Sequence, residues 1–189
     1  MYLFFDTETT GLPKNWKAPV TDLENWPRMI QIGWTLCNTE GKRVDSAEFI
    51  IKPDNFIIPA EASNVHGITT EKALEEGVDL DFVLNKFNEM VSEANFIVAH
   101  NISFDEKIIG AEILRRNIES DFESKPKLCT MKASTDYCKI KGPYGYKWPK
   151  LSELHIQLFG LDFAGAHDAF ADIEATERCF WEMKRLELI

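Results

Sequence analysis

The sequence of 189 residues predicts an α/β protein in which a five-stranded mixed sheet is flanked by helices. Three strand-like segments come first along the chain, and strands then alternate with helices. A hydrophobic fraction of 44% and a charged fraction of 28% are typical of a globular protein that buries a core without disulfides. Since the sequence shows neither an internal repeat nor a linker, we expect a single domain over residues 1–189.

The strands are predicted from short apolar runs and from turn residues between them. The first run, residues 2–5, is wholly apolar and is followed by Asp6, as expected for a buried strand. Asparagine and glycine in residues 38–41 favour a hairpin between the next two strands. Residues 13–28 contain three prolines and two tryptophans, which predicts a long loop over the sheet. The five expected strands cover residues 2–5, 29–36, 44–51, 96–99 and 127–131.

The helices are predicted from capping residues and apolar spacing. Thr69 or Thr70 can cap a short helix that ends at Gly77, and Asp79 or Asp81 can begin the next one. Further helices are expected over residues 103–116, 151–159 and 168–186.

Charge and cysteine content exclude some function classes. Lysine and arginine total 21 and the acids total 31, so the net charge of −10 argues against a broad basic surface for nucleic acid. Bound divalent cations would be another source of positive charge. The four cysteines form no CxxC pair, which indicates reduced, packed thiols and a cytoplasmic protein. No basic leader precedes the first strand and no run reaches the ~18 apolar residues of a membrane span, so we expect no membrane contact.

Acidic side chains stand beside the ends of three expected elements. Asp6 and Glu8 share one face of an extended segment because side chains alternate along a strand. Asp105 follows the fourth strand, and Asp172 lies in the last helix. Such strand ends meet easily in an α/β fold, and carboxylate oxygens without thiolates favour Mg²⁺ or Mn²⁺.

Each of these residues has a simpler explanation when it is taken alone. Asp6 and Glu8 would be solvated acids of a turn, and Asp105 or Asp168 would be a helix N-cap. His100 would be a core histidine that braces, with Asn101, the loop before Asp105. For Asp168 the N-cap role is sufficient.

Three segments that occur in order resemble the DEDDh, or DnaQ-like, 3′–5′ exonuclease family. They are Asp6-Thr-Glu8-Thr-Thr-Gly11, His100-Asn-Ile-Ser-Phe104-Asp105 and His167-Asp-Ala-Phe-Ala-Asp172, with lesser signatures at Val65-His-Gly-Ile-Thr69 and Leu151-Ser-Glu-Leu154. The resemblance covers residues 1–182, the expected catalytic core, and implies a ribonuclease H-like fold.

The resemblance also implies a set of catalytic residues. Asp6, Glu8, Asp105 and Asp172 match the four acids that hold two Mg²⁺ or Mn²⁺ ions, and His167 matches the general base of the histidine subclass. Two such ions, about 3.5–4 Å apart, would clamp the scissile phosphate, activate the attacking water and stabilise the leaving 3′ oxygen. The products would be 5′-mononucleotides.

A second set of residues is implied for the substrate. The backbone of Thr9 and the side chain of Leu12 would contact the terminal nucleotide, and His66 and Ile68 would line its pocket. Core packing is the alternative for the apolar Leu12 and Ile68.

Residues 139–150 interleave four lysines with three aromatic residues. Lysines would meet phosphates, and each aromatic ring stacked on a base would contribute ~1–3 kcal/mol, so the segment is a candidate loop for guiding a single strand. The alternative is a solvated loop whose aromatic rings fold back onto the domain.

The expected function is therefore a metal-dependent 3′–5′ exonuclease that acts on single-stranded or frayed ends, with DNA slightly preferred over RNA, in proofreading, repair or end trimming. Its expected partners are DNA or RNA 3′ ends, with a second copy of the chain or a polymerase or repair protein as further candidates. Three alternatives stay open: an RNA-directed exoribonuclease, a non-catalytic interaction subunit with the same fold, and a hydrolase of small nucleotides.

Overall fold

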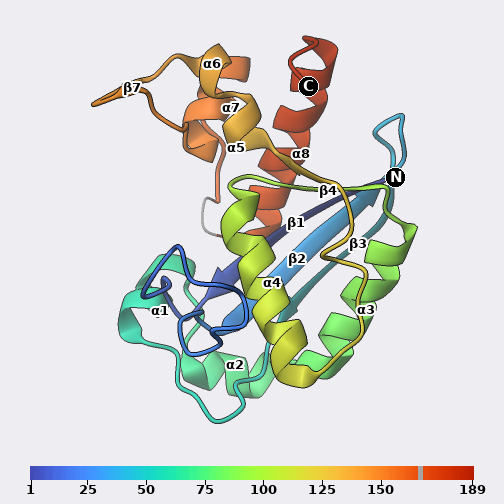
Figure 1. Cartoon of the computed structure of the whole chain (residues 1–189), viewed down its shortest axis with the longest axis vertical. Helices are drawn as coiled ribbons and strands as arrows, with labels where there is room; N and C mark the ends of the chain where they lie inside the picture. The colour runs from blue at the N-terminus through green and yellow to red at the C-terminus, as the bar shows by residue number, and fades with distance from the viewer. Residues whose placement is uncertain (166–167) are drawn as a thin grey trace.

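A five-stranded mixed sheet forms the centre of the computed structural model, which describes residues 1–165 and 168–189 (Figure 1). The strand order is β3-β2-β1-β4-β5. β1 pairs antiparallel with β2 and parallel with β4, so it is the central strand. The strands are β1 (Tyr2–Thr9), β2 (Met29–Cys37), β3 (Arg43–Ile50), β4 (Phe96–Ala99) and β5 (Lys127–Cys129). The predicted fold class is confirmed.

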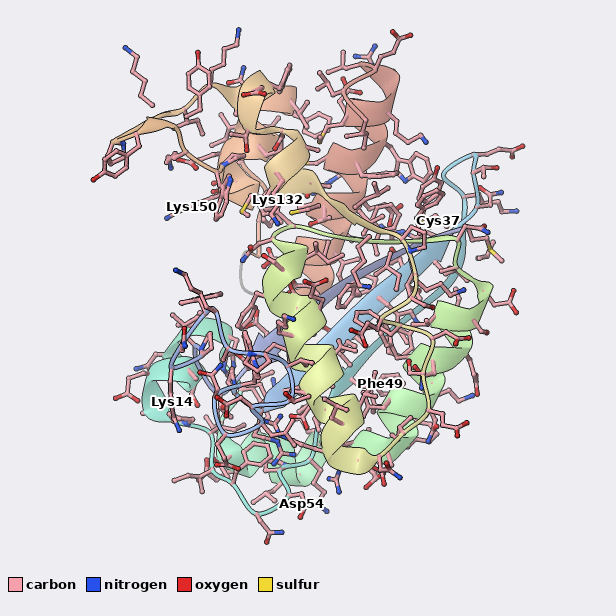
Figure 2. All side chains as sticks on the ribbon, viewed as in Figure 1. Lys14, Cys37, Phe49, Asp54, Lys132 and Lys150 are labelled. Atoms are coloured by element: carbon pink, nitrogen blue, oxygen red, sulfur yellow. The ribbon has the colours of Figure 1, made fainter. Side chains whose placement is uncertain are left out.

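Helices cover both faces of the sheet because side chains of β1 alternate between the two faces. Leu3 and Phe5 pack in the core under α3 (Leu80–Glu93) and α4 (Ile102–Arg116). Phe4 lies on the opposite face, where it packs with Ile173 and Phe180 of α8 (Ala169–Arg185). On β3 the ring of Phe49, labelled in Figure 2, contacts a ring of α3 at a centroid distance of 6.0 Å.

The remaining elements form two smaller groups beside the sheet (Figure 1). α1 (Ala60–His66) and α2 (Thr70–Glu76) share a hydrophobic cluster with Ile30 of β2. The second group contains α5 (Thr130–Ala133), α6 (Thr135–Cys138), the short strands β6 (Lys141–Gly142) and β7 (Gly145–Tyr146), and α7 (Leu151–Phe159). It packs on the C-terminal half of α8 through Leu154, Cys179 and Met183.

Local signals located the main elements well. The expected bounds of β4 and α7 are those observed, and the side chains of Thr69, Asp79 and Asp168 accept N-cap hydrogen bonds. The expectation for residues 127–131 was wrong at its end, because β5 stops at Cys129 and α5 begins at Thr130. α1, α5 and α6 were not predicted, since helices of four to seven residues are too short to show an apolar period.

The long loop 13–28 lies against α4 through buried polar contacts. One guanidinium nitrogen of Arg115 donates to the carbonyls of Leu23 and Trp26 at 2.6 and 2.7 Å. The indole of Trp26 is 4% exposed, and it donates to the carbonyl of Pro19. The loop is therefore a fixed cover of this helix.

The cysteines are free, and three of them are buried. Burial raises the pKa of the Cys37 and Cys179 thiols to about 12, so these thiols stay protonated at neutral pH. The expected packing is confirmed for the three buried cysteines, and their reduced state stays a prediction. Within the described residues, none of the helices has the length and apolar character needed to cross a bilayer.

Glu112 of α4 should be the most costly charged residue to remove. Its carboxylate is fully buried and accepts from Arg28 at 2.9 Å and from the backbone N–H of Met29 at 3.0 Å, with Arg115 also 3.0 Å away. We expect Glu112→Ala to lower the free energy of unfolding by about 3–5 kcal/mol, because two guanidinium groups lose their buried counterion.

Urea denaturation would measure this change, with Glu89→Ala as the matched control. Glu89 pairs with Lys86 on the surface, where both side chains are about half exposed, and its removal should cost no more than about 0.5 kcal/mol. Equal losses in the two variants would contradict the assigned role of Glu112.

Candidate active site

The C-terminal half of β1 supplies two acids on one face of the sheet. Tyr2, Phe4, Asp6 and Glu8 follow the strand period of two and face α8. The ring of Tyr2 lies 5.1 Å from that of Phe180, whereas Asp6 and Glu8 lie beside the first turn of α8. The helix therefore runs antiparallel to β1 and brings its N-terminus to the acids.

Asp172 in that first turn completes a group of three carboxylates. Asp6, Glu8 and Asp172 each offer an oxygen, and these oxygens lie within 4.8 Å of one another. Gly33 of β2, the register partner of Asp6, makes the close approach of α8 possible. A Cβ at this position would meet the terminal methyl of Ile173 at 2.6 Å.

Asp105 reaches the group from the other side of the sheet. It lies in the first turn of α4 and is 3% exposed, and it accepts a hydrogen bond of 2.7 Å from the hydroxyl of Thr7. Thr7 alternates with Asp6 and Glu8, so it faces α4 and links Asp105 to the strand that carries the other two acids. The N-cap explanation for Asp105 was wrong, because Asn101 occupies that position.

Burial and neighbouring charges raise the pKa of three of these acids, Asp6, Glu8 and Asp105. Burial and then the charges of Asp105, Asp172 and Glu8 raise the pKa of Asp6 well above its usual value. Burial followed by the Asp172 and Asp105 charges raises the pKa of Glu8 to about 8. Burial also raises the pKa of Asp105 to about 7, although the hydrogen bond from Thr7 opposes the shift.

This arrangement fits divalent cations. The donor atoms are carboxylate oxygens, which are the ligands preferred by Mg²⁺ and Mn²⁺. Their mutual repulsion would be relieved by a bound cation. The N-termini of α4 and α8 both point toward the group, and their partial positive charge favours it.

The expected general base, His167, lies outside the described residues. Asp168 follows it directly in the sequence and accepts a hydrogen bond of 3.0 Å from the backbone N–H of Ala171. The N-cap role expected for Asp168 is confirmed. The role of His167 stays a prediction.

Two of the expected substrate residues lie at the end of β1. Thr9 is the last residue of the strand, and its hydroxyl donates to the carbonyl of Gly11 at 2.7 Å. The side chain of Leu12 is 73% exposed, so it is not part of the core. Both residues follow the acids within a few positions, and their contacts with a nucleotide stay predictions.

The other two lie around the end of α1. Nδ1 of His66 accepts from the backbone N–H of Ile68 at 3.1 Å, and burial lowers the pKa of His66. Nε2 of His66 is buried without a hydrogen-bond partner among the described residues. Ile68 is buried in the cluster shared by α1, α2 and β2, as the packing alternative states. Their pocket role is a prediction.

His100 and Asn101 fix the loop before Asp105. Nδ1 of His100 lies 2.9 Å from the hydroxyl of Thr130, and Nε2 lies 3.0 Å from the carbonyl of Pro149. Burial lowers the pKa of His100 to about 4, so the ring is neutral and donates from Nε2 to Pro149. Asn101 adopts the left-handed conformation at the start of α4. The bracing role expected for both residues agrees with these contacts.

Thr7 and Gly33 were missed by the sequence analysis. Thr7 stands between the two acids of the first segment, and its alternation with them was the available signal. Gly33 gave no signal, since the approach of α8 to β2 joins residues that are far apart in the sequence.

Carboxylates at the end of the central strand of this mixed sheet agree with the ribonuclease H-like fold that the sequence predicts. The chain belongs to the exonuclease family RNase_T, whose profile matches residues 3–180. The resemblance to DEDDh (DnaQ-like) exonucleases is thereby confirmed, and DEDD exonucleases use divalent metal.

Individual relatives agree with this assignment. The chain is 29% identical over 157 residues to DNA polymerase III PolC-type of Mycoplasmopsis pulmonis, covering 83% of this chain and 10% of the polymerase. It is 28% identical over 180 residues to the uncharacterized exonuclease CP81 of Escherichia phage 186, covering 92% of this chain and 83% of that protein.

Solved structures share the fold. Exonuclease I of E. coli bound to a dA16 oligonucleotide has a TM-score of 0.75 at 20% identity, over 99% of this chain and 42% of that one. Exonuclease I of Methylocaldum szegediense has a TM-score of 0.76 at 21% identity, over 97% of this chain and 40% of that one. The chain thus spans one tenth of the polymerase and about two fifths of these exonucleases.

Removing one acid should stabilise the metal-free protein at alkaline pH. A raised pKa means that folded Glu8 keeps its proton up to about pH 8, whereas unfolded Glu8 loses it near the ordinary glutamate pKa of 4.5. Folding stability is therefore fully present below about pH 4.5 and falls as the pH rises toward 8. In EDTA, we expect Glu8→Gln to be more stable than the wild type by a few kcal/mol at pH 9, at about 1.4 kcal/mol per pKa unit.

Urea unfolding at pH 5 and pH 9 would measure this difference, and the gain should almost vanish at pH 5. Glu40→Gln, an exposed change in the β2–β3 turn, is the control and should leave the free energy of unfolding unchanged at both pH values. The same gain at both pH values would contradict an electrostatic origin.

Proposed function

We propose that the chain is a single exonuclease domain that removes 5′-mononucleotides from the 3′ end of single-stranded or frayed DNA, using two Mg²⁺ or Mn²⁺ ions. The observation that carries the proposal is the group of Asp6, Glu8 and Asp172, joined by Asp105 through its charge and through Thr7. Membership of the exonuclease family supports the reaction class.

The acids would hold the cations at the end of the central strand. Bound cations would orient the scissile phosphate, lower the pKa of the attacking water and stabilise the leaving 3′ oxygen. Asp6 and Glu8 are fixed by β1, and Asp105 and Asp172 by helix N-termini, so their carboxylates need little rearrangement. His167, neutral near pH 7, would accept the proton of the attacking water.

The terminal nucleotide would lie beside the end of β1. Thr9 and Leu12 follow the acids there, and His66 would line the pocket beside them. The exposed side chain of Leu12 is free to pack on a base. Ile68 would act from beneath, by supporting the position of His66 through the 3.1 Å hydrogen bond from its backbone.

DNA is the proposed polymer, and a role beside DNA synthesis or repair the proposed context. The relative from Mycoplasmopsis pulmonis is a DNA polymerase, and exonuclease I has been solved with dA16 and dT13 oligonucleotides. Another exonuclease I structure is described as a zinc-bound complex with single-stranded DNA, which supports a divalent cation. A polymerase or a second copy of the chain is a further candidate partner.

The reaction is tested by a time course on 5′-labelled single-stranded DNA and RNA of matched sequence, with Mg²⁺, Mn²⁺ or EDTA. We expect a ladder that shortens from the 3′ end, appears faster with DNA, and is absent in EDTA and in Asp6→Asn. Degradation by Asp6→Asn at the wild-type rate would contradict the metal site. No degradation of either polymer by the wild type would favour a binding subunit or a hydrolase of small nucleotides.

The general base is tested separately by comparing His167→Ala with Asp168→Asn. Loss of the base should lower kcat by about 10²–10⁴ with little change in KM. Asparagine is as good an N-cap as aspartate, so Asp168→Asn should keep the start of α8 and most of the activity. A wild-type kcat in His167→Ala would exclude the histidine as base.

A further inference from the structure

The segment 139–150 concentrates positive charge in an acidic chain. It contains four lysines and no acidic residue, so it carries +4 while the rest of the chain carries −14. In Figure 2, Lys150 lies at its base, on the same group of elements as Lys132. This local charge is suited to an anionic ligand that the remainder of the surface would repel.

The segment is an ordered hairpin with two different faces. Lys141 pairs with Tyr146 across β6 and β7, and the N–H of Lys147 donates to the carbonyl of Ile140 at 2.9 Å. Ile140 packs against the cluster under α7, and the Lys147 ammonium lies 2.6 Å from the carboxylate of Glu153. One face of the hairpin is therefore attached to the body of the protein.

The other face carries aromatic rings in solvent. Tyr146 is 51% exposed and Trp148 is 61% exposed; Tyr146 ends β7, and Trp148 lies two residues beyond it in the sequence. Tyr144 at the turn is fully exposed, and Lys141 opposite Tyr146 is exposed as well. The rings do not fold back onto the domain, so the solvated-loop alternative is wrong on this point.

The base of the hairpin is tied to the active site. The carbonyl of Pro149 accepts from His100, which directly precedes Asn101 and the helix that carries Asp105. Pro149 is buried, so this attachment is part of the folded core. Figure 1 shows the hairpin projecting on the side where β1 ends and α1 lies. A single-stranded DNA whose 3′ end lies at the acids can extend toward the hairpin.

We propose that the exposed face of this hairpin binds single-stranded DNA upstream of the 3′ end that is being hydrolysed, a proposal that rests on the proposed function. Tyr146 and Trp148 stack on successive unpaired bases, and Lys141 contacts a phosphate between them. Stacking on a ring face needs unpaired bases and tolerates any sequence. The hairpin thus selects a single strand and holds it while the acids act on its end.

Removing the rings should weaken DNA binding without changing the fold, since both side chains are exposed. We expect Tyr146→Ala and Trp148→Ala each to raise the Kd for a dT15 oligonucleotide about tenfold, within the range for loss of one stacked base. Fluorescence anisotropy in EDTA measures the Kd without hydrolysis. The control is Phe82→Ala on α3, away from the hairpin, where a 47% exposed ring is removed and the Kd should not change.

The lysine is tested by the salt dependence of binding. Loss of one phosphate contact on a single strand should reduce the slope of log K against log salt concentration by about 0.7. Lys141→Ala should show this reduction, and Lys42→Ala in the exposed β2–β3 turn should not. Equal slopes in the two variants and the wild type would remove Lys141 from the binding surface.

A small substrate separates this proposal from the proposed function. Thymidine 5′-monophosphate p-nitrophenyl ester occupies only the active site, so Tyr146→Ala and Trp148→Ala should cleave it at the wild-type rate while their KM for dT15 rises. If the wild type cleaves neither substrate, the proposed function fails. If the wild type is active and both variants bind and degrade dT15 normally, the hairpin does not bind DNA and the proposal is overturned in favour of a protein ligand.

Discussion

The gathering of four carboxyl groups at one end of the central strand is the constraint on which the rest of this structure depends. Burial and the charges of neighbouring acids raise the pKa of Asp6 and Glu8, so the ionised site is unfavourable without positive charge. The same strand avoids this cost along its first half, where Tyr2 and Phe4 pack against aromatic residues of α8. The alternation of side chains along β1 therefore has two results. It supplies the hydrophobic contact that holds α8, and it places Asp6 and Glu8 beside Asp172 in the first turn of that helix.

Several contacts hold the acids in place against their repulsion. The hydroxyl of Thr7 donates to Asp105 and joins β1 to α4. Gly33 allows α8 to approach β2, and Glu177 of that helix accepts from Thr35 at 3.0 Å and from Arg43 at 2.8 Å. The site is thus maintained by bonds between distant elements, and its own charges contribute none of that stability in the absence of cations.

The difference between local signals and contacts that join distant elements explains what the sequence could predict. Caps such as Thr69 and Asp79 are local signals, and the strand period alone placed Asp6 and Glu8 together. Asp105 and Asp168 are the same residue type at two helix starts, and no local pattern separates them: the family resemblance assigned Asp105 to the acids, and the fold shows that it is buried while Asp168 caps its helix. The bond between Thr7 and Asp105 spans 98 positions, and no local pattern contains it. The hairpin was visible as a composition of lysine and aromatic residues, but its pairing with Glu153 was not.

Charge has to be arranged differently for the hydrolysis and for binding the DNA strand. Acids are needed where cations bind, and this acidic site lies in a chain of net charge −10, so a polyanion gains little attraction from the domain as a whole. Moving lysines next to the acids would neutralise the cation ligands. Placing them on a hairpin that is fixed to His100 keeps the positive charge outside the site while its base stays attached to the segment before Asp105. Strand affinity and hydrolysis can then be changed independently, because the residues that provide them share a scaffold but no side-chain contact among those described.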